Sequence, residues 1–119
     1  MSTAKDTGQK IENAVAVFLK QQGMRLITRN YHCRGGEIDL IMQDQHTLVF
    51  VEVRYRRSDR FGSALETVNY AKQQRIICTA EHFLQQHKTP YTACRFDVVG
   101  VKPVAMSYDF EWVKDAFQL

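Results

Sequence analysis

The sequence has few of the residues that mark specialised protein classes. Its 119 residues include only three cysteines and two prolines, and 16 basic residues against 13 acidic ones leave a formal charge of only +3. The cysteines form no CxxC pair and their number is odd, which argues against a zinc ribbon and against a disulfide framework. No apolar run approaches the roughly twenty residues of a membrane-spanning helix. The first ten residues are polar, so we expect no secretory signal, no membrane partner and a cytoplasmic location.

The composition that remains is typical of one small globular domain. Hydrophobic residues make up 45% of the chain and charged residues 24%, which is the ordinary globular mixture. A chain of this length buries roughly two thirds of its unfolded surface, so it can fold without a metal or a disulfide. We find no repeat or linker, and therefore expect a single domain over residues 1–119 in which residues 1–7 are flexible.

Apolar residues at helical spacing predict two amphipathic helices. The first covers residues 9–22 and ends at Gly23, and the second covers residues 70–87 with Asn69 as its N-cap. A capping-box pattern at residues 63–66 predicts a short helical turn before the second helix. The apolar stripes consist of Ile11, Val15, Phe18 and Leu19 in the first helix, and of Ile76, Ala80, Phe83, Leu84 and His87 in the second.

Alternating apolar residues predict strands between and after the helices. We expect an α/β fold in which helices flank a small mixed β-sheet, in the order α-β-β-β-α-β, followed by a weaker final strand. The expected strands cover residues 24–31, 37–43, 48–56 and 93–101, and the weaker one covers residues 105–113.

The hairpin formed by residues 37–43 and 48–56 has a register that its apolar residues specify. With the turn centred between Gln45 and His46, one face of the hairpin is continuously apolar, and a shift by one residue would set apolar against polar side chains. The apolar pairs are then Ile38 with Val53, Leu40 with Val51 and Met42 with Val49.

The same register places Asp39 directly opposite Glu52, with their Cβ atoms about 4.5–5.5 Å apart. Two opposed carboxylates repel each other, and a protein can relieve this by protonating one, by surrounding them with arginine or by binding a hard cation. Mg²⁺ favours one or two carboxylates together with retained waters, so the pair is a candidate metal site. The alternative is a surface cluster neutralised by Arg34, Arg54 or Arg56.

Two charged residues on the helices can reach this pair. Glu12 lies at the border of the first apolar stripe, and Lys72 extends the second stripe one turn towards its N-terminus. A solvated glutamate and a lysine that snorkels at the helix end are the alternatives. Arg54 shares a strand face with Glu52 and lies opposite Glu37, so an ion pair with Glu37 competes with a role in charge stabilisation.

A basic segment follows the hairpin. Its arginines are interleaved with Tyr55 and Phe61, a combination that can contact the phosphates and bases of nucleic acid. The alternative is a solvated loop. Before the hairpin, Gly35 and Gly36 are expected to allow a tight approach of the backbone. The candidate nucleic-acid contacts are Arg34, Arg56, Arg57 and Arg60.

The hairpin sequence resembles that of a known family. Residues 36–41, GEIDLI, and residues 49–54, VFVEVR, resemble the YraN-like family of uncharacterised bacterial proteins. That family is similar to archaeal Holliday-junction resolvases within the restriction-endonuclease-like, PD-(D/E)xK superfamily. The resemblance covers about residues 8–117 and extends to Gly8, Glu12, Arg29, Asn30, Tyr31, Phe61, Gly62, Lys72 and residues 95–99.

The resemblance implies a restriction-endonuclease-like core and a nuclease site. It places the superfamily's core acidic residue on Asp39, its (D/E)xK motif on residues 52–54 and its helix acidic residue on Glu12. It implies that these carboxylates bind Mg²⁺ or Mn²⁺ for attack on DNA phosphodiesters, including branched DNA, in a homodimer. The chain departs from the pattern where Arg54 replaces the motif lysine, and Lys72 or a metal-bound water is then expected to take that role.

Three functions therefore remain open. In the first, the protein is a metal-dependent nuclease whose chemistry is carried by Asp39, Glu52, Arg54 and Lys72. In the second, it is a nucleic-acid-binding module that keeps the nuclease fold without cleaving, which the departure at Arg54 favours. In the third, it is a protein-interaction domain whose acidic cluster is structural.

Overall fold

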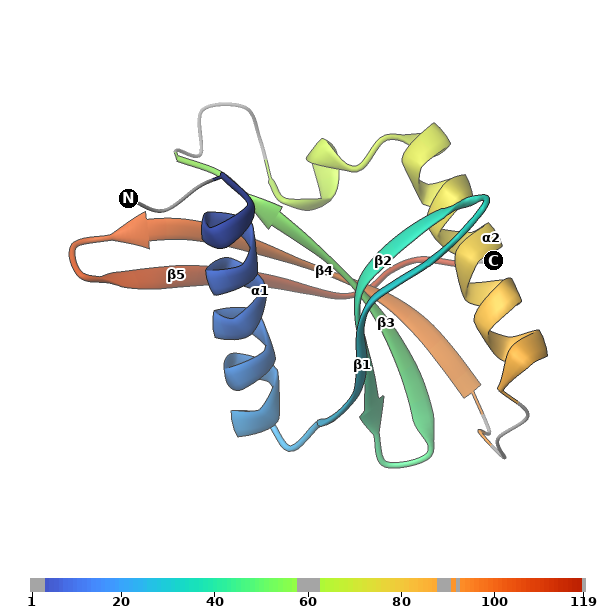
Figure 1. Ribbon diagram of the computed structural model, residues 1–119. Helices are drawn as coiled ribbons and strands as arrows, with labels where there is room; N and C mark the ends of the chain where they lie inside the picture. The colour runs from blue at the N-terminus through green and yellow to red at the C-terminus, as the bar shows by residue number, and fades with distance from the viewer. Residues whose placement is uncertain (1–3, 58–62, 88–90, 92, 119) are drawn as a thin grey trace.

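The computed structural model describes residues 4–57, 63–87, 91 and 93–118, which form two helices and five strands (Figure 1). No helix in this described part of the chain is long and apolar enough to cross a membrane. The elements are, in chain order, α1 (Ala4–Gln21), β1 (Arg25–Cys33), β2 (Gly36–Asp44), β3 (Thr47–Tyr55), the 3₁₀ turn η1 (Leu65–Thr67), α2 (Tyr70–Gln86), β4 (Ala93–Val104) and β5 (Ser107–Phe117).

The five strands form one mixed sheet in the order β1-β2-β3-β4-β5. β3 and β4 run parallel and are connected through η1 and α2, whereas every other neighbouring pair is antiparallel. In Figure 1 the long β4–β5 hairpin extends to the left, and α2 lies on the opposite side near the β1–β2 hairpin. The prediction of an α/β fold with a small mixed sheet flanked by helices is confirmed.

The two helices cover opposite faces of the sheet. Successive residues of a strand point to opposite faces, so each helix packs against alternate residues of the strands. On β3, Val49 and Val51 pack with the apolar stripe of α1, whereas Leu48 and Phe50 pack with that of α2. All four side chains are buried. Because the middle of β3 is covered on both faces, even the charged Glu52 is buried on this strand.

The predicted helices are present, but several element boundaries differ from the predictions; β1 ends at Cys33 rather than at residue 31, β4 at Val104 rather than at residue 101, and β5 at Phe117 rather than at residue 113. α1 begins at Ala4, earlier than residue 9; residues 1–3 lie outside the described chain, and the flexibility expected of residues 1–7 stays a prediction. The final strand begins at Ser107 rather than at residue 105. The reason is that Ala105, with a φ of 51°, forms the preceding turn together with Met106.

The predicted register of the β2–β3 hairpin is confirmed between the turn and Leu40. Leu40 pairs with Val51 and Met42 pairs with Val49. The turn lies at residues 45–46. The apolar alternation therefore specified this register correctly, because a slip of one residue would have moved both valines to the other face of the sheet.

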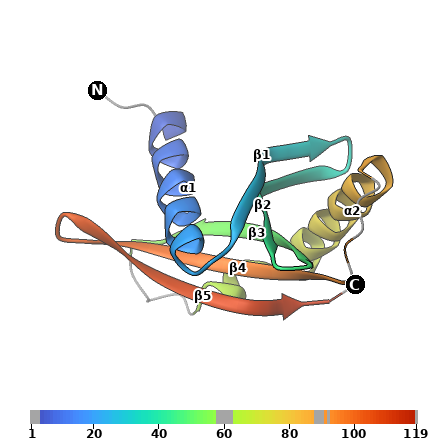
Figure 2. The ribbon, with the colours of Figure 1, turned by 90° about the horizontal axis from the view of Figure 1, so that it is seen from below.

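Beyond Leu40, β2 separates from β3, and this changes the predicted surroundings of two residues. The ladder described for these strands ends at Leu40, and Asp39 Oδ2 accepts the N–H of Val53 at 2.8 Å in place of a backbone carbonyl. The prediction that Ile38 shares a face with Leu40 and Met42 is wrong: Ile38 packs beneath α2, and the other two pack beneath α1. Figure 2 shows the β1–β2 hairpin turning away from β4 and β5 towards α2.

The tip of the β1–β2 hairpin packs closely against α2. A Cβ on Gly36 would lie 2.9 Å from Thr79 Oγ1 and 3.2 Å from the carbonyl oxygen of Arg75. A Cβ on Gly35 would lie 2.9 Å from the sulfur of Cys78. The expected tight approach at these glycines is confirmed, and this docking on α2 accounts for the separation of β2 from β3.

Candidate functional site

An acidic pair lies where β2 separates from β3. Asp39 on β2 is partly exposed, whereas Glu52 on β3 is only 5% exposed. The negative charge of Glu52 acts on the Asp39 carboxyl group, and Asp39 accepts the N–H of Val53, the residue after Glu52, at 2.8 Å. The two carboxyl groups thus meet as expected, although their residues are not paired through the backbone.

Burial and mutual repulsion disturb the protonation of both carboxyl groups. Burial, followed by the negative charge of Glu52, raises the pKa of Asp39 to about 7, and the N–H of Val53 opposes this rise. Burial also raises the pKa of Glu52, against the opposing effects of Lys72 and Arg54. Near neutral pH and without a cation, the pair therefore holds a proton for much of the time.

Lys72 brings a positive charge to the buried member of the pair. Its Nζ lies 3.2 Å from Glu52 Oε1. Its backbone N–H donates to the side chain of Asn69, the N-cap of α2, at 2.8 Å. Lys72 also precedes the buried Ile76 by one helical turn, and residues at this spacing share a helix face. The first turn of α2 thus directs Lys72 towards the sheet, as the sequence predicts.

Arg54 approaches Glu52 less closely and is bound to η1. Its Nη1 lies 3.7 Å from Glu52 Oε1, and its Nε donates to Thr67 Oγ1 at 2.9 Å. The Thr67 hydroxyl in turn donates to the carbonyl oxygen of Ala64 at 2.6 Å. The alternative of an ion pair between Arg54 and Glu37 is wrong, because β2 has already left β3 before Glu37 and Arg54 binds Glu52 and Thr67 instead.

Glu12 on α1 is the third carboxylate that acts on the pair. Burial, followed by the charge of Asp39, raises the pKa of Glu12, and a hydrogen bond from Asn30 opposes this rise. Glu12 is therefore not the fully solvated residue of the alternative interpretation. Among the described residues, however, no group of three or more His, Cys, Asp or Glu side chains could hold a metal ion. Glu12 acts on the pair through its charge.

The acidic pair alone has the donor chemistry that a hard divalent cation requires. Asp39 and Glu52 present carboxylate oxygens, and Mg²⁺ commonly binds one or two carboxylates while it retains several waters. A cation would supply the positive charge that the pair otherwise takes from a proton, which is consistent with the raised pKa of Asp39. The partial exposure of Asp39 gives such an ion access from solvent.

The predicted nucleic-acid contacts have different surroundings. Arg34 lies in the exposed turn between β1 and β2, and Arg57 is exposed just after β3. The side chain of Arg56 is only 12% exposed, and its Nη2 lies 2.8 Å from Glu111 Oε1. Arg60 lies outside the described residues. Arg34 and Arg57 are therefore the arginines of this set that the structure places in contact with solvent.

Glu111 on β5 is a residue that the sequence analysis missed. Besides binding Arg56, its Oε1 accepts the N–H of Ala64 at 2.7 Å. The Glu111 carboxylate thus binds both Arg56 and Ala64, which lie on either side of the chain segment that contains Arg57. Glu111 is 55 residues from Arg56 along the chain, and no local pattern signals such a contact.

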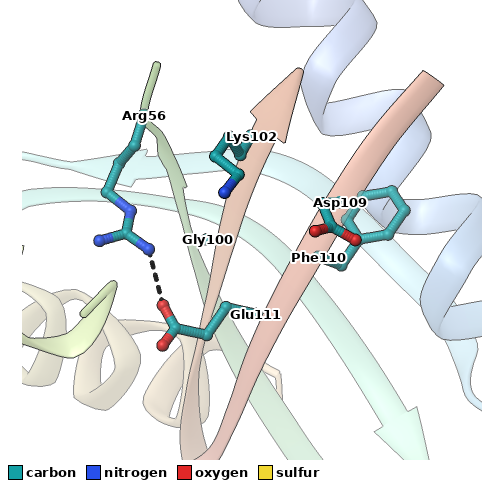
Figure 3. Close-up of a pocket in the computed structure, with 6 residues that line it drawn as sticks. All are labelled: Arg56, Gly100, Lys102, Asp109, Phe110 and Glu111. Atoms are coloured by element: carbon teal, nitrogen blue, oxygen red, sulfur yellow. Dashed lines mark hydrogen bonds and ion pairs between the residues drawn. The ribbon is translucent and has the colours of Figure 1, made fainter. Parts of the chain in front are cut away.

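Beside this carboxylate lies a pocket of about 310 Å³ (Figure 3). The amino group of Lys102 and the guanidinium of Arg56 are both directed into it, and Glu111 approaches from the opposite side. The pocket thus mixes charges of both signs. It is lined by Arg56, Gly100, Lys102, Asp109, Phe110 and Glu111.

The sequence is similar to those of an uncharacterised protein family. The model of "Uncharacterised protein family UPF0102" matches residues 11–101. A UPF0102 protein of Nitrosococcus oceani is 46% identical over 119 residues, which cover 99% of this chain and 96% of that protein. UPF0102 proteins of Saccharophagus degradans and Chromohalobacter salexigens are 47% and 48% identical, over 100% and 92% of this chain and 98% and 89% of their own.

Proposed function

Since the chain belongs to the uncharacterised protein family UPF0102, we propose its function from the site: a cytoplasmic, Mg²⁺-dependent nuclease acting on DNA, including branched DNA. The predicted membership in the YraN-like family of uncharacterised bacterial proteins is confirmed by the same comparisons. The observation that carries the proposal is the pair formed by the partly exposed Asp39 and the buried Glu52, with the Lys72 amine 3.2 Å from Glu52. Buried carboxylates with perturbed pKa values and a nearby cation are typical of catalytic sites.

Each side chain of the site has a separate task in the proposed reaction. Asp39 and Glu52 hold Mg²⁺, which when bound activates a water and neutralises charge on the phosphate. Lys72 keeps Glu52 ionised through their contact and supplies positive charge where the phosphate becomes more negative. Arg54, held by Thr67, contributes a second positive charge that does not titrate.

We assign the role of the missing motif lysine to Lys72. Its Nζ contacts Glu52 at 3.2 Å, whereas the corresponding distance from Arg54 Nη1 is 3.7 Å and the Arg54 Nε is bound to Thr67. In this proposal the Lys72 amine on the first turn of α2 supplies the positive charge beside Glu52 that the motif assigns to its lysine.

DNA is the proposed substrate because its phosphates carry the negative charge that the exposed Arg34 and Arg57 can contact. The sequence resemblance to junction resolvases supports the same choice. A four-way junction has two strands to cut, so we also propose that the active form is a homodimer. Sizing chromatography of the protein with and without a junction tests this assembly.

A cleavage assay tests the proposed function. The protein is incubated with four-way-junction, plasmid and single-stranded DNA in Mg²⁺ or Mn²⁺, with EDTA as the metal-free control. We expect cleavage only with the metal, and a decrease of at least about a hundredfold in Asp39→Asn. Asp44→Asn is the matched control: the same substitution at the other end of β2, where Asp44 contacts Arg95 at 3.1 Å. It should retain cleavage.

One observation favours the second candidate function, a nucleic-acid-binding module that does not cleave. Arg54 occupies the motif position of the lysine and is held by Thr67. DNA binding without cleavage, and with an affinity unchanged in Asp39→Asn, would support this module and contradict the nuclease. Absence of both DNA binding and calorimetric cation uptake would contradict both and leave the acidic pair with a structural role.

A further inference from the structure

The pocket of about 310 Å³ that Arg56 lines lies on the same face of the sheet as Glu52. Alternate residues of a strand point to one face, and Glu52, Arg54 and Arg56 follow each other at this spacing. The N–H of Arg56 donates to the carbonyl oxygen of Val101 at 2.8 Å, so the contact with β4 continues past Tyr55. Arg56 is therefore about 13 Å from Glu52 along the chain, and one DNA molecule can reach both places.

Hydrogen bonds fix the wall of the pocket relative to the acidic pair. Arg54, the residue two after Glu52, donates to Thr67 Oγ1 at 2.9 Å, and the Thr67 hydroxyl donates to the carbonyl oxygen of Ala64 at 2.6 Å. The N–H of Ala64 donates in turn to Glu111 Oε1 at 2.7 Å. The pocket and the acidic pair thus belong to one connected structure.

Gly100 on β4 leaves the space that this wall needs. The residue is buried and pairs with Arg54 of β3. A Cβ on Gly100 would lie 2.6 Å from the Cβ of Ala64, so a side chain there would push Ala64 away from the sheet. The glycine therefore allows the N–H of Ala64 to reach Glu111 beside the pocket.

The lining of the pocket offers both hydrogen-bond donors and acceptors. Arg56 and Lys102 supply donors, whereas Asp109 and Glu111 supply carboxylate oxygens that accept (Figure 3). A phosphate carries only acceptors and a negative charge, so the two carboxylates would repel it. A nucleobase carries both kinds of group: guanine, for example, has O6 and N7 as acceptors and its N2 amino group as a donor. The volume is near the lower limit of small-molecule pockets, which suits a single base.

We propose that this pocket binds one unpaired nucleobase of DNA while the backbone of the same molecule lies over the acidic pair. The inference rests on the proposed function, in which DNA is the substrate. In this proposal Arg56 and Lys102 donate to acceptors of the base, and Asp109 accepts from its amino group. A regular duplex keeps its bases stacked and paired, and extruding one costs free energy. The pocket therefore favours DNA in which a base is already unpaired.

Fluorescence anisotropy tests the inference without requiring cleavage. All proteins carry Asp39→Asn, in which no cleavage is expected, and the buffer contains EDTA. One probe is a duplex with a single bulged guanosine, and the other is the same duplex with an abasic nucleotide in the bulge. We expect about tenfold tighter binding of the guanosine probe, because contacts to one base commonly contribute at least this factor.

Two substitutions in the pocket distinguish a base from a phosphate. Lys102→Gln and Asp109→Ala should each reduce the preference for the guanosine probe several-fold. A phosphate in the pocket would instead give tighter binding of both probes in Asp109→Ala, because a repelling charge is removed. Lys114→Gln is the matched control: it removes the same charge as Lys102→Gln, but Lys114 lies over the Trp112 ring, at 4.6 Å, and does not line the pocket. It should keep the preference.

Equal binding of the two probes by the protein with an unaltered pocket would overturn the inference and leave the proposed function standing. A preference that survives both pocket substitutions, or tighter binding of both probes in Asp109→Ala, would overturn it in the same way. If neither probe is bound, the proposed action on DNA fails and the inference fails with it.

Discussion

The sheet buries carboxylates in two regions, and the regions differ in how completely the negative charge is compensated. Asp97 on β4 is 0% exposed and has a donor for each oxygen. Arg95 Nε lies 3.1 Å from its Oδ1 and 3.3 Å from its Oδ2, the Trp112 ring N–H donates to Oδ2, and the backbone N–H of Asp115 donates to Oδ1, both at 2.9 Å. The ion pair between Arg95 and Asp97 therefore lies within a complete set of donors to both Asp97 oxygens.

The acidic pair is compensated much less completely. Asp39 experiences the negative charge of Glu52, and among the described residues only one amine, that of Lys72, is within 3.2 Å of either carboxylate. The pKa of Asp39 rises to about 7 because burial and the second carboxylate outweigh the N–H of Val53. Burial alone thus does not distinguish a functional carboxylate from a structural one. A deficit of positive charge does, because a bound cation can supply it.

The largest expected effect is the loss of stability on changing Asp97. Asp97→Asn removes the charge that compensates Arg95 and sets an amide donor against the N–H group of either Trp112 or Asp115. Breaking a buried pair of this kind costs about 3–5 kcal/mol in the free energy of unfolding, which urea denaturation measures. The same substitution at the other region, Asp39→Asn, should cost little, because it removes a repulsion. Equal losses in the two variants would contradict the comparison.

A smaller effect is expected on the pH dependence of stability in the metal-free protein. The folded-state pKa of Asp39, about 7, lies above its ordinary value of 3.8, so between these pH values the folded state binds a proton that the unfolded state has released. Stability should therefore fall as the pH rises from about 4 to about 7, by up to roughly 3 kcal/mol, and level off above that.

Urea denaturation in EDTA across this pH range measures the fall in stability. Asp39→Asn should remove most of it, and Mg²⁺ in excess should offset the loss at pH 7 because it binds only the folded state. A fall that persists unchanged in the variant would show that another group is responsible and that the acidic pair is compensated after all.

Part of this site could be predicted from the sequence. The alternation of apolar residues specified the β2–β3 register, and with it the approach of Asp39 to Glu52. Helical spacing likewise directed Lys72 to the sheet, because it precedes the buried Ile76 by one turn. The register and the direction of Lys72 could both be predicted because each depends only on the spacing of apolar residues within one strand or one helix. The use of the site for metal binding and DNA cleavage stays a prediction.

The separation of β2 from β3 could not be predicted in the same way. It follows from the docking of Gly35 and Gly36 on α2, a contact between segments that are far apart in the sequence. The faces of Ile38 and the partner of Arg54 were mispredicted for this reason, since both predictions continued the hairpin beyond Leu40. The spacing of apolar residues predicts the faces of a single helix or strand, but it does not predict where contacts with another element end the pairing of two strands.

The smallest expected effect concerns Glu111, a compensated carboxylate that is not buried. Its side chain is 43% exposed and binds Arg56 at 2.8 Å, so Glu111→Gln should lower the free energy of unfolding by only about 0.5–1 kcal/mol, as measured by urea denaturation. Glutamine keeps an acceptor for the N–H of Ala64, and the loss should shrink in high salt because it is mainly electrostatic. For these two compensated carboxylates, the loss in the free energy of unfolding on substitution would then increase with the burial of the side chain, from Glu111 to Asp97. A loss at Asp39 that fell on the same trend would mean that burial explains all three residues, and the argument for a cation at the acidic pair would fail.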